Sequence, residues 1–140
     1  MWALLLSLVA VGQVALGPAE RERPDTPEGL IADLIDGRDV DQLYAARELR
    51  RLTSVALRDH KGRDPIRSME ARQFLVIFDD RLAPACITLL PSRHLQRPCV
   101  DILGMLQAQA ALTPLLALKS EASWSRRRRI DRAIGRIKEG

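Results

Sequence analysis

The sequence predicts an all-α fold built from antiparallel helical hairpins, and three observations support this prediction. Ala and Leu are frequent and aromatic residues make up only 4% of the chain, a composition that favours helices over a β-sandwich. From Leu30 onward, apolar residues recur at helical spacing between turn signals. Short segments of one pattern also recur along the chain, as is typical of stacked helical units.

The first residues predict an export signal. Residues 1–19 carry no charged side chain, and the apolar run from Trp2 to Val11 has the length of a signal-peptide core. Small residues at the end of this segment predict cleavage after Ala19. Because no Lys or Arg precedes the apolar run, an uncleaved membrane anchor over residues 2–17 is the alternative. Export predicts a periplasmic or secreted protein.

Residues 20–28 are predicted to be a linker. They are mostly charged and contain two prolines, so they cannot bury apolar surface. Residues 29–140 then have a length typical of one domain. Within this domain, FLVIF (74–78) is the one strand-like run. It continues a helical pattern that starts at Met69, so we predict a helix there as well.

Four short segments share one pattern, with a small or aliphatic residue first and bulky apolar residues at the fifth and eighth positions. They are AARELRRL (45–52), ARQFLVIF (71–78), CVDILGML (99–106) and IDRAIGRI (130–137). Their fifth positions are separated by 26, 28 and 31 residues. Matching apolar stretches, 82–90 and 112–120, precede the last two segments. The predicted unit is therefore helix, turn and second helix, which buries its apolar face only against neighbouring units.

With this pattern the chain resembles the HEAT-like (armadillo-like) repeat proteins, especially the short repeats of bilin-lyase-type and related bacterial proteins. The resemblance covers about residues 28–138. In that family the second helix ends in a Leu-Gly pair, which Gly104 and Gly135 match and the first two segments lack. The frequent arginine of the family matches only Arg127. The resemblance implies a short right-handed α-solenoid of three to four hairpins, a fold that most often serves as a binding scaffold.

The C-terminal part of the chain is basic. Residues 81–140 carry 11 basic and 4 acidic side chains, a net charge of +7, whereas residues 1–80 carry a net charge of −3. In the predicted last helix, one stripe is apolar, and Trp124 is expected to join it from the N-terminal end. The stripe consists of Ile130, Ala133, Ile134 and Ile137. A candidate basic ridge lies beside or opposite this stripe and consists of Arg128, Arg129, Arg132 and Arg136.

Two interpretations of this ridge stand side by side. The ridge is either the polar outer face of a terminal capping unit, which a stack needs for solubility, or a binding surface. As a binding surface it suits an acidic partner protein or an anionic membrane surface. Nucleic acid is disfavoured, because an exported chain without stacking aromatic residues has little opportunity to bind it.

Cys86 and Cys99 are a candidate disulfide. The turn between their helices is expected near Pro91 and Ser92, which places the two cysteines at matching height in an antiparallel pair. A bond between them would close a loop of about 14 residues and add roughly 3 kcal/mol of stability. The alternative is two buried thiols that pack as small apolar groups.

No pattern of catalytic or metal-binding residues occurs in the sequence. His60 and His94 are isolated, and neither a zinc motif, a calcium loop nor a nucleophile motif is present. We therefore expect no enzyme activity, no cofactor and no metal. The sequence predicts an exported scaffold module that binds another protein. The alternative is a membrane-anchored envelope component whose basic C-terminal helix contacts anionic lipid or an acidic partner.

Overall fold

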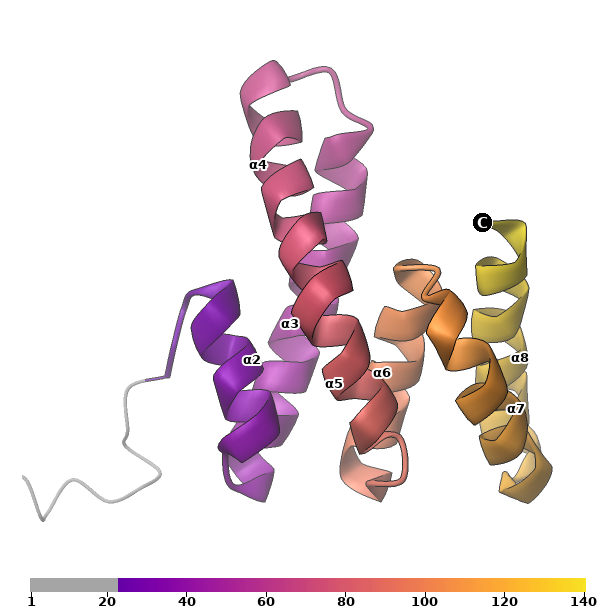
Figure 1. The fold of residues 1–140 in the computed structure, drawn as a ribbon. Coiled ribbons are helices and arrows are strands. Elements are labelled where there is room, and N and C mark those ends of the chain that lie inside the picture. The colour runs from indigo at the N-terminus through magenta and orange to yellow at the C-terminus, as the bar shows by residue number, and fades with distance from the viewer. Residues whose placement is uncertain (1–22) are drawn as a thin grey trace, which may run out of the picture.

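A computed structural model describes residues 23–140, and every regular element in this range is a helix (Figure 1). The predicted all-α class is thereby confirmed. The predicted signal segment, residues 1–19, and the start of the predicted linker lie outside the described residues. The first described helix, α2 (Pro27–Asp36), begins two residues before the predicted domain boundary. The hydroxyl oxygen of Thr26 caps it, accepting a 3.1 Å hydrogen bond from the Gly29 amide.

The first hairpin is formed by α2 and α3 (Asp39–His60). The two helices bury aliphatic side chains against each other, among them Leu34 of α2 and Leu49 of α3. The second half of α3 extends beyond α2, and α4 (Pro65–Ile77) packs along this extension (Figure 1).

The segment 71–78 differs in position from the other three repeat segments. It is helical, as predicted, but it lies on α4, which continues without a loop through a π-helical turn, Phe78–Leu82, into α5 (Ala83–Leu89). Both end residues of the π turn are fully buried, whereas α4 itself buries only Ala71. The segment therefore lies inside a long continuous helix, whose first part packs on α3.

The other two hairpins follow the predicted pattern. α5 pairs with α6 (Arg93–Met105) across a turn at residues 90–92, where the sequence predicted it. After a 3-10 turn, Gln109–Ala111, α7 (Leu112–Glu121) pairs with α8 (Trp124–Glu139). α6 packs between α3 and α8, so the second helices of the three hairpins form one row, with α2, α5 and α7 to one side of it (Figure 1).

α6 and α8 approach each other closely at Gly104. A Cβ atom at this position would lie 2.9 Å from the Cα atom of Ala133, closer than real Cβ atoms come to other heavy atoms. The glycine of the predicted Leu-Gly pair therefore allows α8 to pack directly on the backbone of α6. At Gly135, the matching position in α8, a Cβ atom would meet no described atom within 4 Å.

Candidate anion-binding site between α6 and α8

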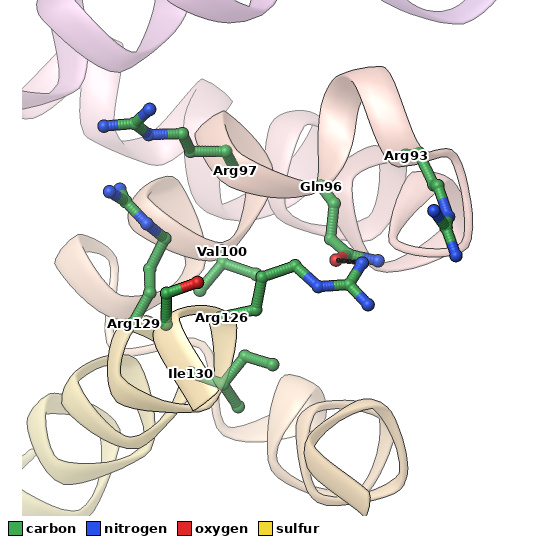
Figure 2. Close-up of a pocket in the computed structure, with 8 residues that line it drawn as sticks. Arg93, Gln96, Arg97, Val100, Arg126, Arg129 and Ile130 are labelled. Carbon is green, nitrogen blue, oxygen red and sulfur yellow. Dashed lines mark hydrogen bonds between the residues drawn. The ribbon is translucent and has the colours of Figure 1, made fainter. Parts of the chain in front are cut away.

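α6 and α8 line an open hollow of about 380 Å³ near their N-terminal ends (Figure 2). Its lining residues are Arg93, Gln96, Arg97 and Val100 of α6, and Ser125, Arg126, Arg129 and Ile130 of α8. Since half of these eight residues are arginines, we call it the arginine hollow. Its volume lies within the range of about 300–1,000 Å³ that is usual for small-ligand sites.

Helical periodicity brings these side chains to one place. The α6 residues are spaced three, four and seven positions from Arg93, a spacing that puts them on one face of a helix. Arg126, Arg129 and Ile130 of α8 have the corresponding spacing. Val100 of α6 and Ile130 of α8 are buried. Arg93 and Arg97 of α6 are exposed, and Arg126 and Arg129 of α8 are half-buried.

Gln96 holds one wall of the arginine hollow in a fixed position. It is 7% exposed, and its amide nitrogen donates a 2.9 Å hydrogen bond to the carbonyl oxygen of Leu90. Its amide oxygen accepts a 3.1 Å hydrogen bond from the Arg126 guanidinium, which reaches toward it in Figure 2. Because Gln96 is uncharged, this bond orients Arg126 without neutralising it.

Asp101 is the acidic residue that pairs with an arginine of this hollow. Nη1 of Arg129 lies 3.0 and 2.8 Å from its two carboxylate oxygens, and Arg50 of α3 donates to the same carboxylate at 3.3 Å. One carboxylate thus connects three helices. No carboxylate of residues 23–140 forms an ion pair with Arg93, Arg97 or Arg126, so the arginine hollow keeps a net positive charge.

The four arginines of the predicted basic ridge have different neighbours in the structure. Arg129 turns toward α6, and Arg136 lines a separate hollow together with residues from the end of α3. Arg128 lies over the ring of Trp124, with 5.0 Å from its guanidinium carbon to the ring centroid. Arg132 is exposed. Of the four residues, only Arg129 lines the arginine hollow.

Trp124 does not join the apolar stripe of α8, contrary to the sequence prediction. Its side chain is 72% exposed, whereas all four predicted stripe residues are buried. The reason is geometric: Ile130 lies six positions after Trp124, a rotation of about 240° around the helix. Trp124 therefore lies well outside the stripe.

Sequence reasoning missed Arg93, Gln96 and Arg97 as site residues. Their signal was the four-residue spacing of the two arginines near the start of a helix that the repeat pattern places beside the last one. No local motif distinguishes this pair from an ordinary solvated helix face. The pair becomes part of a candidate site only because arginines of α8 lie beside it in the fold.

Cys86 and Cys99 meet between α5 and α6, at the matching height expected from their distances to the turn. Both are fully buried, and both are free thiols in the structure. A hydrogen bond with the Cys99 thiol, together with burial, raises the pKa of Cys86 well above its ordinary range. The two side chains are thus neighbours, and the disulfide between them stays a prediction.

The remaining chemistry of the described chain is sparse. No group of three or more His, Cys, Asp or Glu side chains in residues 23–140 is arranged to hold a metal ion. His94 lies 3.2 Å from the amide oxygen of Gln42, a contact between α6 and α3. None of the helices in this range is both long and apolar enough to cross a bilayer. Comparison of the chain with protein-family models, with curated proteins and with solved structures gives no match to any of them.

Proposed function

We propose that this chain is a non-enzymatic interaction module that binds an acidic partner protein. The observation that carries the proposal is that four arginines from α6 and α8 line one hollow, of which Asp101 neutralises only Arg129. Guanidinium groups pair with carboxylates through two parallel hydrogen bonds, so arginine suits the recognition of acidic side chains.

The proposed scaffold is a short right-handed α-solenoid of the HEAT-like kind. Its support is the row of α3, α6 and α8, each the second helix of a hairpin, and the close approach of α6 and α8 at Gly104. In such a stack the second helices share one face of the molecule. The export signal proposed for residues 1–19 would place this face in the periplasm or outside the cell.

The experiment compares two double variants that remove the same charge. Arg97→Gln with Arg126→Gln changes the arginine hollow, whereas Arg128→Gln with Arg132→Gln changes the outer side of α8. Binding of a fluorescent polyglutamate peptide is measured by anisotropy at two salt concentrations. We expect the first variant to lose about tenfold in affinity and the second to lose less, because charge-assisted hydrogen bonds act only at contact. Equal losses would contradict a defined site.

One observation favours a second function, contact with anionic lipid. The exposed Trp124 carries Arg128 over its ring and lies beside the arginine run, and aromatic and cationic side chains together are typical of membrane interfaces. Sedimentation with anionic and with neutral vesicles tests it. Binding to anionic vesicles that Trp124→Ala abolishes would support this function over the first.

A further inference from the structure

A second hollow adjoins the arginine hollow. It also measures about 380 Å³ and lies between the turn after α5 and the facing side of α7. Its lining residues are Ile87, Leu90, Pro91, Arg93, Gln96, Pro114, Ala117, Leu118, Glu121 and Arg126. Six of these ten residues are apolar and the other four are polar or charged, and we call it the apolar hollow after the larger group. Arg93, Gln96 and Arg126 line both hollows and thus form a shared wall.

We propose that the two hollows form one composite site for an acidic peptide segment of the partner protein. A carboxylate side chain of the segment occupies the arginine hollow, and a neighbouring aliphatic or aromatic side chain occupies the apolar hollow. This inference rests on the proposed function and specifies the chemistry of its partner.

The shared wall is the reason for expecting the two side chains on one ligand. Gln96 is held at both ends, by the carbonyl oxygen of Leu90 and by Arg126, so the wall does not have to be ordered on binding. A segment crossing this wall places one side chain on each side of it. The carboxylate gains its interaction from Arg97, and the apolar side chain is removed from water by Ile87 and Leu118.

Glu121 makes the composite site selective against a second acidic side chain. It lines the apolar hollow at its exposed side, where it repels a second carboxylate. A segment with an acidic residue beside an apolar one is therefore favoured over a uniformly acidic segment. This preference separates the proposal from general attraction between opposite charges.

The test uses three synthetic peptides of equal length, each made in both residue orders. One combines Asp and Glu with Leu and Phe, one replaces Leu and Phe by Ser, and one replaces Asp and Glu by Asn and Gln. We expect the wild-type protein to bind the acidic-apolar peptide about tenfold more tightly than either of the others.

Three variants assign the two halves of the site. Arg97→Gln should remove the preference for acidic peptides and keep the preference for apolar ones, and Leu118→Ser should do the reverse. If Leu118→Ser lowers the melting temperature of the domain, Ala117→Gln is used in its place, because Ala117 lies at an exposed position of the same hollow. Arg136→Gln, outside both hollows, is the control and should leave both preferences intact.

Each outcome bears on a different statement. If the acidic-serine peptide binds as tightly as the acidic-apolar peptide, the composite site is wrong and the proposed function stands. If no acidic peptide binds, both fail. If anionic vesicles bind with the same dependence on Arg97 and peptides do not, the ligand is lipid and the composite peptide site is wrong.

Discussion

Gly104 and Gly135 occupy matching places in two repeat segments, but their surroundings differ. A side chain at Gly104 would collide with the backbone of α8, whereas open space surrounds Gly135. A sequence pattern treats the two positions as equivalent, because it records the residue type and not the neighbouring helix. Substituting each glycine by alanine therefore distinguishes the effect of helix–helix packing from the effect of helix propensity on stability.

Gly104→Ala should lower the free energy of unfolding by about 1–3 kcal/mol, because the new methyl group forces α6 and α8 apart. Gly135→Ala should raise it by up to about 1 kcal/mol, because alanine loses less backbone entropy than glycine in a helix. Urea unfolding of both variants measures the difference. An unchanged stability for Gly104→Ala would contradict the close packing of the two helices.

The Cys86 thiol makes the free energy of unfolding fall as pH rises into the alkaline range. Its folded-state pKa is raised by the Cys99 hydrogen bond and by burial, so the unfolded chain loses this proton first as pH rises. The free energy of unfolding is therefore constant below the unfolded thiol pKa, about 8.5. Above that value it falls by at most about 1.4 kcal/mol per pH unit for one thiol.

The measurement is urea unfolding with reductant present, at neutral pH and at several alkaline pH values. In Cys86→Ala the contribution of this thiol is absent, so the decline above the unfolded pKa should be shallower than in the wild type. Parallel curves for the two proteins would mean that Cys86 is not perturbed. Thiol labelling of native protein without reductant determines separately whether the predicted disulfide forms.

At the scale of elements, the sequence predicted the helices and the last two hairpins correctly, but it could not place α4. The segment 71–78 has the same apolar signature as the three second helices, yet Val76 is exposed and Leu75 only half-buried. An eight-residue pattern predicts which face of a helix is apolar, but it does not predict which other helix packs on that face. The π turn after Ile77, which joins α4 to α5, has no signature in that pattern either.

α4 should open more readily than the rest of the molecule, since Ala71 is its one buried residue. Its start depends on Asp64, whose carboxylate accepts hydrogen bonds from the amides of Ile66 and Arg67 at 3.0 and 3.4 Å. Asp64→Ala should weaken this helix by about 1 kcal/mol. Hydrogen exchange should become faster in α4 and stay unchanged in α6 and α8.

Ser68 provides a comparison on the same helix, because its hydroxyl donates to the carbonyl oxygen of His60 and not to the first turn of α4. Ser68→Ala should therefore have a smaller effect on exchange in α4 than Asp64→Ala. If Asp64→Ala accelerates exchange in every helix equally, α4 unfolds only together with the whole domain, and the local opening is wrong.

At the scale of the whole molecule, the charge asymmetry of the sequence indicated that the basic surface belongs to the C-terminal half. Residue numbers alone could not show which arginines line one hollow. Arg97 and Arg126 are 29 positions apart and line the same hollow only because α6 and α8 are adjacent. The predicted ridge relied on spacing within one helix, so it included Arg132, which is exposed and does not line the arginine hollow.

Asp101 affects both the stability of the fold and the positive potential of the arginine hollow. Its carboxylate pairs with Arg50 of α3 and Arg129 of α8, and it also reduces the positive potential of the arginine hollow. Asp101→Asn should lower the free energy of unfolding by about 1 kcal/mol, because both ion pairs are partly exposed. The same change should raise affinity for the acidic-apolar peptide about twofold to fivefold at low salt.

Asp131→Asn is the matched control, since it removes the same charge from an ion pair with Lys119 at 2.6 Å between α7 and α8. Asp131 pairs with Lys119, which does not line the arginine hollow, whereas Asp101 pairs with Arg129, which does. This variant should therefore raise peptide affinity less than Asp101→Asn. Anisotropy titrations across a range of salt concentrations measure both variants. Equal gains would show that only net charge attracts the peptide. A gain confined to Asp101→Asn would mean that binding depends on the potential within the arginine hollow, which one carboxylate limits while it joins three helices.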